Sequence, residues 1–240
     1  MNGAFLNAFG ILLGALYGLT RRAPLPARVQ SFFRAGLGVF TLFTGARLVL
    51  ENLGAPFPTG LKRLLIALLA VTLGYWAGKL LRLQNLSNWL GRRAGRCIAA
   101  ADEHPPGRPA AGLAAGVVLF GAAPLGWLGA VENGFTGWWC LLAAKAVMDA
   151  LAMAGLVKMF GWLPALSAFP VLGLFGGLTF VCQTEAAPFC QAHHLTDSVN
   201  AVVGLAACAV SLVILEVRRV ELTNFLPGLV VAPLLEWFWR

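Results

Sequence analysis

The stretch "GWWCLLAAKAVMDALAMAGLVKMFGW", residues 137–162, places a lysine and an aspartate four residues apart in an apolar run. Lys145 and Asp149 are its only charges before Lys158. On insertion scales, each charge at the centre of a membrane helix costs about 2.5–3.5 kcal/mol. A spacing of four residues puts both side chains on one helical face, where they can pair. We therefore expect that face to point into a helix bundle or toward water, and not toward lipid.

The whole chain is as apolar as this stretch. It has 240 residues, of which 59% are hydrophobic and 12% charged, and its mean hydropathy is +0.77. Soluble domains have about a quarter charged residues. Apolar runs of about 20 residues, long enough to cross a hydrocarbon layer of ~30 Å, recur along the sequence. The composition predicts an all-α, polytopic transmembrane helix bundle that forms one integral membrane domain over residues 1–240.

Eight apolar segments are predicted, and they run over residues 3–20, 30–50, 61–81, 111–131, 137–157, 162–183, 198–216 and 222–239. Pro227 and Pro233 interrupt the last one, so about 7–8 spans are expected. Residues 83–108 form the longest polar stretch. Their pattern predicts an amphipathic helix at the cytoplasmic surface that connects spans three and four and ends at Pro105 and Pro106.

The distribution of basic residues predicts the orientation. The first apolar segment is followed by positive charge, which indicates a retained helix with its N-terminus outside. Twelve basic residues then face the cytoplasm and only three face outward, as the positive-inside rule requires. The twelve are Arg21, Arg22, Arg28, Lys79, Arg82, Arg92, Arg93, Arg96, Arg108, Lys158, Arg218 and Arg219, and the three are Lys62, Arg63 and Arg240.

Proline and glycine break several segments. Segment four contains Pro124, segment six contains Pro164 and Pro170, and segment eight reads "NFLPGLVVAPLL". Proline frees a backbone carbonyl, which in a membrane must find a partner in protein or in a wet cavity. Transporters often bind substrate at such breaks, although kinks also occur in ordinary bundles. Glycines spaced by four residues predict close helix packing, within one chain or between two copies; they are Gly10, Gly14, Gly18, Gly74, Gly78, Gly112 and Gly116.

The candidate substrate- or ion-binding residues are polar groups inside or beside the apolar segments. Lys145 and Asp149 are central, and they form either a static ion pair that locks helices or a proton- or ion-linked site. The other candidates are Asn7, Asn200, Asn224 and Glu132. Asparagine amides both donate and accept, so they suit helix cross-linking as well as ligand coordination.

Other chemistries have weaker support. Cys182, Cys190, His193 and His194 gather near the outer face, but their spacing matches no familiar zinc site. A disulfide between the two cysteines and unpaired thiols are the alternatives. No phosphate-binding loop, nucleophile elbow or zinc-protease spacing is present, so no enzyme, cofactor or metal site is predicted. The basic residues lie in short connections and not on one soluble face, which argues against nucleic-acid binding.

Several motifs together resemble a known family. "NGAFLNAFGILLGALYG" opens the chain, "GLGVFTLFTG" follows, then "GAVENGFTG" with "KAVMDALA", and "NFLPGLVVAPLL" closes it. In this order they are similar to the bacterial membrane-protein family called domain of unknown function 554. The resemblance implies a multi-pass protein of the bacterial inner membrane, and transport is the role suspected for such proteins.

Two functions follow as hypotheses. The first is a transporter of a small solute or ion, with Lys145 and Asp149 as the coupling pair. The second is a non-transporting scaffold or sensor of the bilayer, oligomeric or not, that presents its basic cytoplasmic helix to a partner. A cavity that reaches Asp149 would favour transport, whereas a dry, packed pair would favour the scaffold. An intramembrane enzyme ranks third, because no nucleophile and base are suitably spaced.

Overall fold

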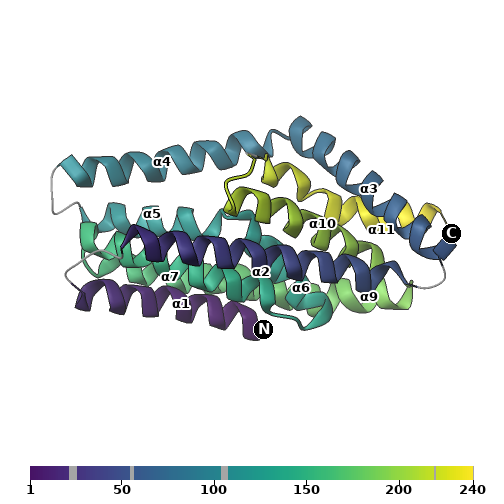
Figure 1. The fold of residues 1–240 in the computed structure, drawn as a ribbon, viewed down its shortest axis with the longest axis horizontal. Coiled ribbons are helices and arrows are strands. Elements are labelled where there is room, and N and C mark those ends of the chain that lie inside the picture. Colours follow the sequence, from purple (N-terminus) through teal and green to yellow (C-terminus); the bar gives the residue numbers. More distant parts are fainter. Residues whose placement is uncertain (22–25, 55–56, 104–107, 219, 240) are drawn as a thin grey trace.

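Figure 1 shows the computed structural model, which describes residues 1–21, 26–54, 57–103, 108–218 and 220–239. Three basic residues of the charge count, Arg22, Arg219 and Arg240, and the helix-ending Pro105 and Pro106 lie outside these ranges. Within the described ranges the regular structure is entirely helical. The predicted all-α polytopic bundle is therefore confirmed.

The elements follow the apolar segments closely. They are α1 (Asn2–Thr20), α2 (Ala27–Leu53), α3 (Phe57–Leu80), α4 (Leu83–Glu103), α5 (Pro109–Gly121), α6 (Pro124–Thr136), α7 (Cys140–Phe160), η1 (Leu163–Ser167), α8 (Ala168–Val181), η2 (Cys182–Ala186), α9 (Ala187–Ala192), α10 (Thr196–Ile214), η3 (Leu222–Phe225) and α11 (Gly228–Phe238).

Six helices in the described part of the chain are long and apolar enough to cross a membrane. They cover α1, α2, α3, α7, the run Leu163–Ala192 and α10. Helices α5 and α6 together form a seventh candidate that is bent by 55°. The predicted eighth segment is a shorter apolar helix over Leu222–Phe238, because Pro227 separates the 3-10 turn η3 from α11.

Helices α1 and α7 pack backbone to backbone. A Cβ placed on Gly10 would lie 2.6 Å from the Ala146 carbonyl oxygen, so no larger residue fits there without a shift. Two further glycines of α1 contact alanines of α7 in the same way, Gly14 with Ala150 and Gly18 with Ala154. Small residues allow this close approach between membrane helices. This predicted glycine face is thus used within one chain.

Helices α2 and α10 form a second close pair. A Cβ on Gly45 would lie 2.7 Å from the Gly204 carbonyl oxygen, and one on Gly204 would lie 2.6 Å from the Gly45 carbonyl oxygen. Helix α3 approaches α11 and η3 in a similar way, through Gly74 against Gly228 and Gly78 against Asn224. Close helix pairs therefore form the framework on which the buried polar residues are placed.

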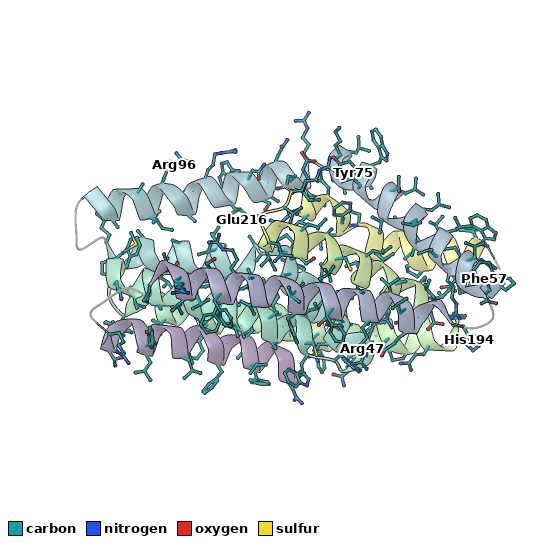
Figure 2. All side chains as sticks on the ribbon, viewed as in Figure 1. Arg47, Phe57, Tyr75, Arg96, His194 and Glu216 are labelled. Carbon is teal, nitrogen blue, oxygen red and sulfur yellow. The ribbon has the colours of Figure 1, made fainter. Side chains whose placement is uncertain are left out.

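Helix α4 carries the basic residues of the long polar stretch. In Figure 1 it runs lengthwise beside α5, and Figure 2 shows Arg96 directed away from the bundle. Ala94 and Ala101 are buried, and Ile98 packs against the core around α5 and α7. One face of α4 is therefore bound to the bundle. Its placement at the cytoplasmic surface stays a prediction.

Candidate functional site

Lys145 and Asp149 form a buried ion pair on α7. The distance between Lys145 Nζ and Asp149 Oδ2 is 2.5 Å, and the two residues are 1% and 6% exposed. Alanines of α7 contact α1, while the Lys145 side chain points toward Phe120 of α5, Gly126 of α6 and Phe175 of α8. Both charges are directed into the bundle, as the high cost of charge in lipid requires.

Two aromatic rings and a glycine surround the lysine. Lys145 Nζ lies 5.9 Å from the ring centroid of Phe120 and 5.4 Å from that of Phe175. The negative faces of such rings attract an ammonium group. A Cβ on Gly126 would lie 2.6 Å from Lys145 Cε, so the absent side chain leaves room for the lysine stem. The ammonium is held by the Asp149 carboxylate and by aromatic contacts from α5 and α8.

The site lies at the break between α5 and α6. Helix α5 ends at Gly121 and α6 begins at Pro124, which has no N–H to donate. The Trp127 indole N–H donates to the freed Gly121 carbonyl at 3.0 Å. Phe120 precedes the break, Gly126 follows it, and both contact the side chain of Lys145. The intramembrane charge pair and the discontinuous helix are therefore neighbours in space.

Asn7 on α1 completes the site. It is fully buried and lies within interaction range of the Asp149 carboxylate. Neither its amide nitrogen nor its amide oxygen has a hydrogen bond of normal geometry to another described residue. Such an unsatisfied buried group costs about 1–3 kcal/mol. The amide is therefore positioned to bind a polar ligand or water beside the Asp149 carboxylate.

Glu132 lies apart from this group. It is fully buried beside the first turn of α7, at Leu141, where the positive end of the helix favours a carboxylate. In the part of the chain that the structure describes, neither carboxylate oxygen has a hydrogen-bond partner of normal geometry. Glu132 also lines a pocket of about 170 Å³ that is bounded by Arg47, Glu51 and Trp138. Glu132 is an acidic residue near the predicted outer end of the bundle. It is not among the residues that surround the Lys145–Asp149 pair.

The other two predicted asparagines cross-link helices. Asn200 Nδ2 on α10 donates to Asn52 Oδ1 on α2 at 3.1 Å. Asn224 Nδ2 donates to Glu221 Oε2 at 2.8 Å, and Asn224 Oδ1 accepts from the Gln84 backbone N–H at 3.2 Å. The Asn224 amide is satisfied on both sides by protein partners, whereas Asn200 Oδ1 has no hydrogen-bond partner of normal geometry among the described residues. The structure thus gathers Lys145, Asp149 and Asn7 and leaves these two elsewhere.

The charge pair is enclosed. The pockets between the described helices have volumes of about 390, 170, 410 and 430 Å³, and neither Lys145 nor Asp149 lines any of these four. Lys145 and Asp149 therefore lie in an occluded position in this structure.

The cysteines and histidines near the predicted outer face do not gather into one cluster in the described part of the chain. Cys182 and Cys190 are buried free thiols, so the disulfide alternative is not realised. No group of three His, Cys, Asp or Glu side chains among the described residues could hold a metal ion. The His193 ring lies 4.8 Å from the Phe189 ring and 4.7 Å from the Trp237 ring. These contacts are packing between α9 and α11.

The fold and the buried pair define a polytopic, all-α membrane protein with charge inside its helix bundle. Comparison with known families then places the chain. It belongs to the family described as "Protein of unknown function (DUF554)", whose model matches residues 2–237.

Two relatives align along nearly their whole length. "Uncharacterized protein YqgA" of Escherichia coli (strain K12) is 26% identical over 238 residues, which cover 99% of this chain and 97% of the relative. "Uncharacterized membrane protein YdfK" of Bacillus subtilis (strain 168) is 20% identical over 234 residues, 97% of this chain and 94% of the relative. No solved structure matches the chain significantly.

Proposed function

We propose that this protein is a transporter of a small solute or ion in the bacterial inner membrane, and not an enzyme. Lys145 and Asp149 would be its coupling pair. The observation that carries the proposal is one juxtaposition: the buried ion pair lies beside the α5–α6 break and next to the fully buried amide of Asn7. Transporters build substrate sites from such discontinuous helices near the bilayer midplane.

The pair supplies a mechanism for coupling. Removing one partner of a buried ion pair leaves the other charge uncompensated, at a cost of about 3–5 kcal/mol. A cation or proton that binds Asp149 must therefore compensate for the loss of Lys145. An anion that binds Lys145 must compensate for the loss of Asp149. Asn7 can donate to or accept from the incoming group, since its amide lies beside the Asp149 carboxylate. Binding of a ligand is thereby linked to rearrangement of the pair.

The α5–α6 break supplies a place for movement. The enclosed pair corresponds to an occluded state, because the described pockets do not reach it. Bending at Gly121–Pro124 would move Phe120 and Gly126 away from Lys145 and open the site. Relative motion of bundle parts around a fixed site is the general basis of alternating access.

A second candidate function is a non-transporting scaffold or sensor, either monomeric or homo-oligomeric. The enclosure of the pair favours it, because a packed Lys145–Asp149 pair can simply lock α7 in position. Helix α4, whose exposed face carries Arg92, Arg93 and Arg96, would then contact a partner.

A liposome flux screen tests the proposal. Purified protein is reconstituted, and a panel of ions, amino acids and carboxylates is assayed at several pH values. Asp149→Asn and Lys145→Gln should abolish flux or change its pH dependence. Glu51→Gln is the matched control, because Arg47 and Glu51 form an exposed pair with the same spacing.

Two results would contradict the proposal. Transport by Asp149→Asn with an unchanged pH profile would remove the coupling role of that carboxylate. A folded, reconstituted protein that moves no solute in the panel, but that retains a soluble protein through α4 in a pull-down lost on Arg92→Glu, would favour the scaffold.

A further inference from the structure

A pocket lined by two basic residues lies at the seam between the two close helix pairs. It has a volume of about 390 Å³ and opens between α1 and α7 on one side and α2 and α10 on the other. Arg34 and Lys158 line it, together with the polar side chains of Tyr17 and Gln30. The rest of the lining is apolar and is formed by Leu37, Met148, Leu151, Ala152, Ala154, Gly155 and Ile214. The pocket thus combines basic and polar side chains with an apolar lining.

The charges at this pocket favour an anion. Arg34 forms an exposed ion pair with Glu216, which follows the end of α10 and is labelled in Figure 2. Lys158 is the second cation on the lining. Both cations belong to the end of the bundle at which basic residues are concentrated, where a lipid headgroup would lie.

An apolar groove continues from this pocket. It has a volume of about 430 Å³, shares Leu151 with the pocket, and includes Phe33, the neighbour of Arg34 in sequence. Its lining is Leu6, Phe9, Gly10, Leu13, Phe33, Ala143, Ala146, Val147, Ala150 and Leu151. Along α7 the groove extends from Leu151 to Ala143, a rise of about 12 Å. No lining residue of the groove is charged, so it suits a hydrocarbon chain.

We propose that pocket and groove together bind one anionic phospholipid. Its phosphate would lie between Arg34 and Lys158, and an acyl chain would follow the groove along the α1–α7 contact. A soluble phosphate would use the cations but not the groove. A zwitterionic lipid would bring an added positive charge toward the two cations. This site is separate from the Lys145–Asp149 pair and does not depend on transport.

Native mass spectrometry of the intact protein tests this inference. Protein is released from nanodiscs that contain equal amounts of phosphatidylglycerol and phosphatidylcholine, and bound lipids are counted. One phosphatidylglycerol should be retained in preference to phosphatidylcholine. Arg34→Gln and Lys158→Gln should each lower that affinity by roughly fivefold, the effect of about one basic residue near an anionic lipid. Arg93→Gln on α4 should change nothing.

Two further variants separate the contributions of charge and groove. Glu216→Gln should raise the affinity for phosphatidylglycerol, because it removes the acid that competes for Arg34. Val147→Trp should lower binding of the lipid while both cations remain, since the added ring fills the groove. Neither change touches Lys145 or Asp149, so folded protein can be verified by thermal unfolding.

Three results would overturn the inference. They are equal retention of the two lipids by the unchanged protein, the same retention in Arg34→Gln and Arg93→Gln, and binding of inorganic phosphate or glycerol phosphate as tightly as of the lipid. The last result would assign the pocket to a soluble anion.

Discussion

Gly126 on α6 lies directly against the Lys145 side chain. A methyl group added to the Gly126 Cα would come within 2.6 Å of Lys145 Cε. The same methyl group would collide with the Phe175 ring. The chain therefore accommodates the lysine by omitting a side chain on the facing helix. This relationship connects the α5–α6 break to the charge pair and leads to the first prediction.

Gly126→Ala should destabilise the protein by about 1–3 kcal/mol, the usual cost of overpacking a core. Thermal unfolding in detergent measures this. Gly173→Ala on α8 is the control, because no described atom lies within 4 Å of a Cβ at that position. Equal melting temperatures for the two variants would show that Lys145 is not confined as described.

The Lys145–Asp149 pair should behave as a buried pair in a double-mutant cycle. Asp149→Leu alone should destabilise by about 3–5 kcal/mol, because an ammonium is left without its counter-charge. Lys145→Met combined with Asp149→Leu should recover most of that loss. Denaturant unfolding measures both.

The exposed pair Arg47–Glu51 provides the comparison for this cycle. Both side chains are more than 40% exposed, so breaking this pair should cost about 0–1 kcal/mol. Similar costs for the two pairs would mean that the α7 pair is solvated.

Asn7 and Asn200 should respond in opposite ways to loss of the amide. Asn200→Ala removes a hydrogen bond to Asn52 and should destabilise by about 1 kcal/mol without changing the pH dependence of any transport. Asn7→Leu removes the amide beside the Asp149 carboxylate, which makes no hydrogen bond of normal geometry, so transport should fall while stability changes less than in Asn200→Ala. Unfolding and flux assays on both variants check this. Loss of stability in Asn7→Leu with normal flux would make Asn7 a structural residue.

Trp127 should stabilise the helix break through its indole N–H. Trp127→Phe keeps the ring but removes the donor to the Gly121 carbonyl, which should cost about 1 kcal/mol. Hydrogen exchange at residues 118–126 should become faster. Trp76→Phe on α3, where the ring is exposed, is the matched control. Unchanged exchange in Trp127→Phe would contradict a capping role.

The sequence predicted the features that depend on the residues of one helix alone. Apolar runs predicted the all-α bundle, and the four-residue spacing of Lys145 and Asp149 predicted a shared face that must avoid lipid. The prediction that Pro227 interrupts the eighth segment also agrees with the structure, because Pro227 lies between η3 and α11.

The residues that surround the Lys145–Asp149 pair could not be predicted from the sequence alone, because they come from other helices. Phe120 and Phe175 reach Lys145 from α5 and α8, and nothing in an apolar run indicates which phenylalanines will face α7. Asn7 and Asn200 are equivalent as sequence signals, yet only the first faces Asp149. Gly126 had one usable signal, its position two residues after the helix-breaking Pro124.

The glycine face of α1 also has a consequence for biosynthesis. Its partner alanines on α7 lie about 136 residues later in the chain, counted from Gly10 to Ala146. At ordinary rates of translation that interval lasts on the order of ten seconds. During that time the first helix must reside in the bilayer, or beside an insertion factor, with its complementary surface unoccupied. The contact between α1 and α7 can therefore form only after α7 has been synthesised. A chain truncated before α7 lacks the helix that packs against α1.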